Sequence, residues 1–144
     1  MIRRSVRSDN DFIRKYDEFT GDRKVESMRA ELFVYILDNN PVGYITISNN
    51  LFLNYPMISY LCVQPEHRRK HIATKLISHI RELYHGCPIW VTTEEWNQPM
   101  KDLLLKNGFG ESGALKFLNK DGSRECFYVN NPIFPSSNTI DIQK

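Results

Sequence analysis

The chain has 144 residues, of which 41% are hydrophobic and 25% charged, so it is neither a disordered nor a collagen-like sequence. This length suits one domain with one core. Nineteen basic residues against 17 acidic ones leave a net charge of +2. That balance excludes a protein that coats nucleic acid or anionic membrane with most of its surface, so any basic site must be local.

Cysteine usage and hydropathy indicate a reduced protein outside the membrane. Cys62, Cys87 and Cys126 form no C-x-x-C pair, which argues against a disulfide framework or a structural zinc site. The charge-free stretch 39–65 is long enough to cross a bilayer, but it contains five Asn and three Pro, which hydrocarbon would not tolerate. No apolar signal segment follows the first basic residues. We therefore expect a cytoplasmic protein without a membrane partner.

The first half of the chain predicts short strands with helical connections. Asp9-Asn10 can cap a helix with Phe12, Ile13, Tyr16 and Phe19 on one face, and Asn49-Asn50 with Asn54 mark a turn. The continuous apolar run 57–63 is typical of a central strand covered on both faces. The predicted elements are a strand at 2–6, the capped helix, a short helix or loop at 21–30, a hairpin of 32–37 and 43–47 around the turn 38–41, and the strand 57–63.

The second half predicts a parallel crossover followed by a helix and a hairpin. Apolar residues recur at helical spacing from Arg69 to Tyr84, between the strands 57–63 and 89–92. A strand, a helix and a strand in this order normally form a right-handed parallel unit. Further predicted elements are a helix from Asn97 to Asn107-Gly108, a hairpin of 114–118 and 125–129, and a tail at 131–144. The domain is thus expected to span 1–130.

A basic turn, His67-Arg68-Arg69-Lys70-His71, stands between the central strand and the helix predicted up to Tyr84, which has the clearest apolar periodicity in the chain. Each exposed cation there opposes the helix dipole at a cost of about 0.3–1 kcal/mol, so the run suggests a bound anion. Free amides at a helix N-terminus together with Arg and Lys suit a phosphate or pyrophosphate, and the small Ala73 allows close approach. The alternatives are a solvated basic turn or a nucleic-acid patch.

Two stretches resemble the GNAT superfamily of N-acetyltransferases. Arg68-Arg69-Lys70-His71-Ile72-Ala73 is similar to the family's signature Q/R-x-x-G-x-G/A, with His71 in place of the middle glycine. The segment from Asn97 to Gly108-Phe109 is similar to the family's Asn, helix and K-x-G-F sequence. The order of predicted elements over 1–130 agrees with that fold.

The resemblance implies a single-domain α/β fold with a mixed central sheet flanked by helices, in which two splayed parallel strands form a cofactor cleft. It implies transfer of an acetyl group from acetyl-CoA directly to a primary amine of a small molecule or peptide. By position, main-chain groups of the central strand would bind the acetyl and pantetheine parts, and amides of the basic turn would hold the pyrophosphate. The cofactor-binding residues implied are Leu61, Cys62, Val63, Arg68, Arg69, Lys70, His71, Ile72, Ala73, Thr74, Asn97 and Lys106.

The catalytic groups are less clear from the resemblance. Met57 stands where some members carry a glutamate, and Leu104 where many carry a tyrosine. An amine must attack as the free base, so a general base is useful, and Glu94 and Glu95 after the second parallel strand are the candidates. Alternatively, this pair is a solvated lead-in to the next helix.

No metal site is expected. His67 and His71 stand at i and i+4, but no third ligand follows at a characteristic spacing. The alternative function is a non-catalytic regulatory module that binds CoA or nucleic acid through the turn 67–71. By the resemblance, the loop at about 20–30 and the final hairpin set the acceptor, and Asp17, Glu18, Asp22 and Glu26 could attract a cationic amine. The sequence leaves the acceptor open, and it leaves open whether the protein is a monomer or a homodimer.

Overall fold

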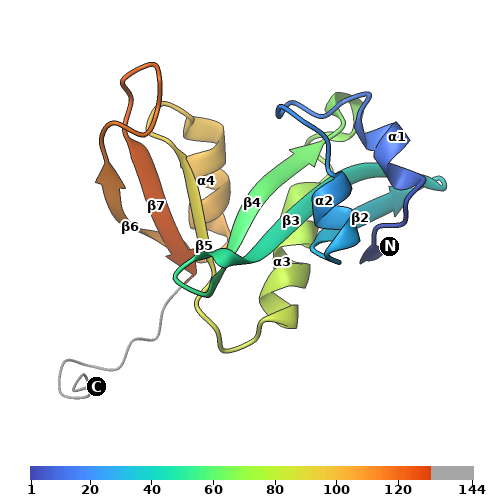
Figure 1. Ribbon diagram of the computed structural model, residues 1–144, viewed down its shortest axis with the longest axis horizontal. Helices are drawn as coiled ribbons and strands as arrows, with labels where there is room; N and C mark the ends of the chain where they lie inside the picture. The colour runs from blue at the N-terminus through green and yellow to red at the C-terminus, as the bar shows by residue number, and fades with distance from the viewer. Residues whose placement is uncertain (131–144) are drawn as a thin grey trace.

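The computed structural model describes residues 1–130 and shows a seven-stranded sheet with helices on both faces (Figure 1). The strand order is β1-β2-β3-β4-β5-β7-β6. The strands are β1 (Ile2–Arg4), β2 (Leu32–Leu37), β3 (Asn40–Phe52), β4 (Tyr55–Val63), β5 (Trp90–Glu94), β6 (Phe109–Leu115) and β7 (Glu125–Asn130). The helices are α1 (Asp9–Ile13), α2 (Lys24–Met28), the 3-10 turn η1 (Pro65–His67), α3 (Ile72–Leu83) and α4 (Gln98–Lys106). The predicted tail at 131–144 lies outside the described residues.

The sheet consists of two antiparallel halves joined by one short parallel contact. Strands β1 to β4 are antiparallel, as are β5, β7 and β6. Strand β4 pairs with β5 only at Met57 with Trp90 and Ile58 with Val91. The predicted parallel pair of strands is therefore confirmed, and Figure 1 shows the two halves diverging beyond this contact.

The apolar core lies in two clusters, one on each face of the sheet. Helices α3 and α4 cover the larger cluster, which includes Leu76, Ile80 and Leu104, and α1 packs on the smaller one, which includes Ile13 and Tyr44. Strand β4 contributes to both clusters, as predicted for a central strand. Among residues 1–130, no helix has the length and apolar character needed to cross a membrane.

The predicted first helix is shorter than expected. Helix α1 ends at Ile13, so Tyr16 and Phe19 are not part of it. Beyond it, the amides of Tyr16 and Asp17 still donate to the Ile13 carbonyl, at 3.0 and 2.9 Å, and close one last turn. Side chains then fix this segment on β3: Tyr16 Oη donates to the Pro41 carbonyl at 2.7 Å, and Tyr44 Oη donates to Asp17 Oδ1 at 2.6 Å. The N-cap is Ser8 rather than Asp9, whose carboxylate accepts from the Val6 amide.

Two further predictions, one about a turn and one about a strand, were right only in part. Asn49-Asn50 lie inside β3, and the turn is Leu53-Asn54, where both residues have positive φ. Asp38-Asn39 have the same geometry, which two-residue hairpins require and which Asn and Asp tolerate. The predicted strand 114–118 is β6, which begins at Phe109 and ends at Leu115. Most of this edge strand is exposed, so it lacks the apolar alternation by which a strand is predicted.

Candidate active site

Two adjoining cavities open where β4 and β5 diverge, each of about 470 Å³. We call the first the main cavity; it is lined by Glu18, Phe19, Ile58, Ser59, Tyr60, Leu61, Cys62, Val63, Arg68, Ala73, Val91, Thr92, Thr93, Glu94, Asn97, Pro99, Met100, Leu103 and Glu125. We call the second the basic cavity; it is lined by Val63, His67, Arg68, Arg69, His71, Ile72, Ala73, Thr74, Pro99, Asp102, Leu103, Lys106 and Asn107. Val63, Arg68, Ala73, Pro99 and Leu103 line both.

The divergence of the strands leaves part of β4 unpaired on its β5 side. The parallel pairing stops at Ile58, so β5 does not engage the main chain of Ser59 to Val63. Ser59 is an extra residue relative to β3, because Thr46 pairs with Tyr60 and the next residue of β3 with Ile58. Such a bulge bends a strand and increases its twist. An extended ligand can therefore add to the free edge as a further strand would.

The basic turn presents main-chain amides at the start of α3. Arg69 and His71 have φ of 70° and 61°, whereas Lys70 between them is not among the residues with positive φ. Alternation between right- and left-handed residues can turn successive N–H groups toward one side, as in an anion-binding nest. The helix begins at Ile72, later than the predicted Arg69, because His71 is a left-handed N-cap. Arg69 and His71 line the basic cavity.

The other basic side chains of the turn have partners within the protein. Arg68 donates through Nε to the Val63 carbonyl at 2.9 Å and pairs through Nη2 with Glu18 at 2.7 Å. The Val63 carbonyl is thus already engaged. Lys70 lines neither cavity, and its Nζ lies 3.1 Å from His67 Nδ1.

Helix α4 forms the wall opposite β4. Asn97 Oδ1 accepts from the Met100 amide at 3.2 Å, which confirms the predicted N-cap, and Asn97 also lines the main cavity. Lys106 reaches the basic cavity from the last turn. Leu104 is fully buried in the core and lines neither cavity.

The two candidate bases lie in different environments. Glu94 lines the main cavity, where Oε1 accepts from Thr93 Oγ1 at 3.4 Å. Glu95 lies outside both cavities and accepts from the Arg124 amide and from Arg124 Nε. Its hydrogen bond from the Arg124 amide, supported by the guanidinium, lowers the pKa of Glu95.

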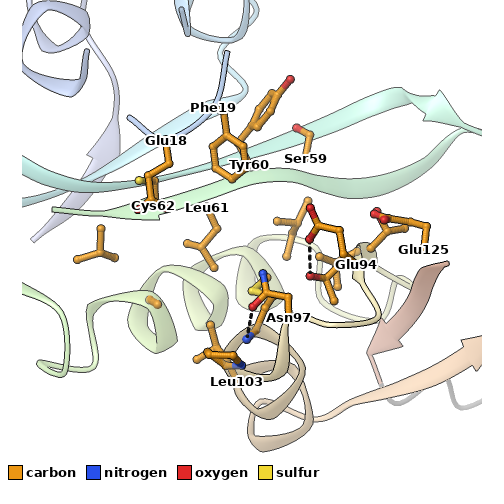
Figure 2. A pocket seen from close by; sticks show the side chains of 18 of the residues that line it. Glu18, Phe19, Ser59, Tyr60, Leu61, Cys62, Glu94, Asn97, Leu103 and Glu125 are labelled. Carbon is orange, nitrogen blue, oxygen red and sulfur yellow. Dashed lines mark hydrogen bonds between the residues drawn. The ribbon is translucent and has the colours of Figure 1, made fainter. Parts of the chain in front are cut away.

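A second carboxylate joins Glu94 at the same end of the main cavity. Glu125 stands directly opposite Glu94 in the register of β5 and β7, and its Oε1 accepts from Asn119 Nδ2 at 3.0 Å. Within residues 1–130, neither carboxylate has an ion-pair partner. Figure 2 shows the two side chains together at one end, with Leu61 pointing from β4 toward Asn97 and Leu103.

Sequence reasoning missed several residues of the main cavity. Phe19, Tyr60 and Glu125 come from three distant segments, and Glu125 reaches Glu94 only through the β5–β7 pairing. Of the acidic residues expected near the acceptor, Glu18 lines the cavity, while Asp17, Asp22 and Glu26 do not. The sequence marked Phe19 only as an apolar residue on one face of the expected first helix.

Cys62 and the histidines are the remaining groups that could carry chemistry at this site. Burial raises the pKa of Cys62, and its Sγ lies 3.8 Å from the Tyr16 carbonyl as a weak donor. The thiol is therefore protonated at neutral pH and is a poor nucleophile. In the part of the chain that the structure describes, no three His, Cys, Asp or Glu side chains come together as a metal site.

The sequence model of the acetyltransferase (GNAT) family matches residues 3–109. The chain therefore belongs to this family, as its two motifs predicted. A comparison with curated proteins found no match.

Solved structures share the whole fold. An acetyltransferase of the GNAT family from Bacillus cereus is 26% identical with a TM-score of 0.79, covering 90% of this chain and 95% of that one. The ribosomal-protein-S18-alanine N-acetyltransferase from Escherichia coli is 14% identical with a TM-score of 0.72, covering 96% and 97%. An aminoglycoside 6'-N-acetyltransferase complexed with coenzyme A is 14% identical with a TM-score of 0.70, covering 94% and 98%. The predicted single-domain mixed α/β fold is thus confirmed.

Proposed function

We propose that the protein is an N-acetyltransferase that moves an acetyl group from acetyl-CoA directly to a primary amine. The observation that carries this proposal is the junction of two cavities, one basic and built on the start of α3, the other running along the free edge of β4. Membership of the GNAT family and a neighbour that holds coenzyme A support it.

The basic cavity suits the pyrophosphate of acetyl-CoA. Arg69, His71 and Lys106 line it with only one carboxylate, Asp102, and the amides at the start of α3 add hydrogen-bond donors. Ala73 lines both cavities and is small enough for a ligand to pass from one to the other. The pantetheine arm would then follow Leu61 to Val63 as an added strand, facing Asn97 of α4. Of the remaining sequence candidates, Arg68, Ile72 and Thr74 also line the basic cavity, whereas Lys70 does not.

The main cavity suits the amine and its proton. The amine nitrogen forms a bond to the acetyl carbonyl carbon, the C–S bond breaks, CoA leaves as a thiolate, and the amine loses a proton. We assign that proton to Glu94, because its carboxylate faces the cavity whereas that of Glu95 is held by Arg124. Leu104 and Met57 cannot transfer a proton, and the protonated thiol of Cys62 supports direct transfer without an acyl-cysteine.

The acceptor class is a small molecule or peptide with a free amine. Amines are the acceptors named for the Escherichia coli and aminoglycoside-acetylating neighbours. The three cysteines are free, which fits a reducing, cytoplasmic location. The proposed oligomeric state is a monomer or a homodimer.

The first test is binding of acetyl-CoA. Ligand at about 100 times Kd stabilises a folded protein by about 2.7 kcal/mol, so acetyl-CoA and CoA should both raise Tm clearly. Ala73→Glu places a carboxylate and extra bulk between the two cavities, and we expect it to abolish that rise while the unliganded Tm stays close to wild type.

Ser78→Glu is the matched control, because Ser78 is an exposed position of α3 that lines neither cavity. Its CoA-induced rise in Tm should equal that of the wild type. No stabilisation of the wild type by either CoA species would refute the proposal. Stabilisation by an oligonucleotide instead would favour the non-catalytic nucleic-acid-binding module.

A further inference from the structure

Arg23 is a buried cation just before α2. Its side chain is only 3% exposed, although it does not line either cavity. Nη2 donates to the Thr20 carbonyl at 2.7 Å, and Nε lies 3.5 Å from Asp17 Oδ2, close enough for an ion pair but without hydrogen-bond geometry. Nη1 is enclosed and has no hydrogen-bond partner in residues 1–130. A buried charge with incomplete partners is costly, so its presence calls for an explanation.

The carboxylate beside Arg23 fixes the loop that follows α1. Asp17 is itself buried, with 5% of its side chain exposed, and Oδ1 accepts from Tyr44 Oη at 2.6 Å and from the Phe19 amide at 3.1 Å. Burial and the hydrogen bond to Asp17 raise the pKa of Tyr44, so the phenol remains a donor. Asp17 thus connects Tyr44 of β3 to the backbone of Phe19, and Arg23 lies beside this carboxylate.

The guanidinium of Arg23 lies against an aromatic wall of the main cavity. Its Cζ is 3.8 Å from the centroid of the Tyr60 ring, and the Phe19 ring is 5.0 Å from the same centroid. Phe19 and Tyr60 line the main cavity but not the basic cavity. Figure 2 shows their rings together on one side of β4, while Leu61 points to the other. The two rings therefore lie away from the proposed pyrophosphate end.

We propose that Arg23 is a positioning residue for the amine acceptor, acting through Tyr60 and Phe19. This inference rests on the proposed acetyl transfer. A planar guanidinium stacks on an aromatic ring, which a flexible ammonium does not reproduce, so Arg23 holds the Tyr60 ring while Asp17 holds the backbone of Phe19. Buried ion pairs can often be replaced by apolar or neutral groups of similar volume without loss of stability, so we expect the fold to tolerate the loss of both charges.

The test separates acceptor binding from cofactor binding. The probe is whichever of spermidine, kanamycin and a hexapeptide with a free α-amino group the wild type acetylates fastest, with CoA thiol release as the readout. The double variant Asp17→Asn/Arg23→Met removes both charges and should keep Tm close to wild type. We expect its acceptor KM to rise about fivefold or more, with KM for acetyl-CoA within about twofold of wild type.

Two further variants distinguish positioning from a merely structural charge. Arg23→Lys keeps the positive charge but not the stacking, so it should also raise the acceptor KM, whereas a structural role of the charge would be rescued by Lys. Arg29→Met, at an exposed residue at the end of α2, should leave both KM values unchanged.

An acceptor KM within twofold of wild type in the double variant would overturn the role of Arg23, and so would rescue to that value in Arg23→Lys. So would a parallel rise in the KM for acetyl-CoA. These outcomes leave the proposed function standing, because that function is tested separately by the binding of acetyl-CoA to the wild type.

Discussion

At the scale of single residues, His71 stands at the glycine position of the family motif and adopts a backbone conformation that glycine favours. Its φ of 61° and ψ of 21° lie in the left-handed region, and Arg69 nearby has a φ of 70°. This region costs an ordinary L-residue about 1–2 kcal/mol, although His adopts it more often than most side chains. The turn at His71 thus has a conformation that glycine adopts without steric cost, and the main-chain amides at the start of α3 remain available for an anion.

His71 can be tested by separating backbone from side chain. His71→Gly removes the steric cost and should leave the free energy of unfolding equal or higher, whereas the β-branched His71→Val should lower it by about 1–2 kcal/mol. Urea unfolding measures this difference. If the turn holds the pyrophosphate through its amides, the Gly variant should keep its acetyl-CoA affinity and the Val variant should lose it. Equal losses in both variants would assign the effect to the imidazole instead.

The residues of the two cavities differ in how far the sequence could predict them. Six of the thirteen residues that line the basic cavity lie between Arg68 and Thr74, and one local motif was enough to predict those six. Those of the main cavity, such as Phe19, Tyr60 and Glu125, come from different elements and meet only because of the strand order. Sequence spacing carries no information about that order beyond the crossover from β4 to β5.

At the scale of elements, Asn97 connects the stability of α4 to the main cavity. Its side-chain oxygen accepts from the Met100 amide, and an N-cap of this kind is worth about 1 kcal/mol. Asn97→Ser preserves a capping oxygen, so the free energy of unfolding should stay within about 0.5 kcal/mol of wild type, whereas Asn97→Ala should lower it by about 1 kcal/mol. We expect both to weaken acetyl-CoA binding, measured by calorimetry. Full affinity in Asn97→Ser would leave Asn97 a cap only.

The sequence predicted best those elements whose buried residues recur as apolar residues at a regular spacing. Helix α3 has a strong apolar stripe, and four of its residues are buried. The short helix α2 and the edge strand β6 have little buried surface, so their patterns are weak. The predicted turn included Asn49-Asn50 as well as Asn54, because these asparagines suit a turn equally well, and only the pairing of β3 with β4 selects among them.

At the scale of the whole molecule, the net charge of +2 conceals a separation of charge along the site. Arg69, His71 and Lys106 line the basic cavity, while Glu94 and Glu125 line the far end of the main cavity. Arg68 and Glu18 neutralise each other where the cavities meet. An anionic donor and a cationic acceptor would therefore approach opposite ends, although the protein as a whole attracts neither strongly.

This separation makes Glu94 and Glu95 a matched pair for the last prediction. Glu94→Gln removes the carboxylate that faces the acceptor, and we expect kcat for amine acetylation to fall by about a hundredfold, the usual minimum for a general base. KM for acetyl-CoA should not change. Glu95→Gln should alter kcat less than about twofold, because Arg124 already holds its carboxylate outside the cavity.

The pH dependence identifies the cause of the loss in Glu94→Gln. Without a base, the reaction depends on amine that is already deprotonated, and that fraction grows about tenfold per pH unit below the pKa of the amine. The deficit of Glu94→Gln relative to wild type should therefore shrink as pH rises, and it should do so at lower pH for an α-amine, with a pKa near 8, than for a lysine side chain near 10.4. A deficit that is the same at every pH would contradict proton transfer by Glu94 and indicate that its charge only binds the acceptor.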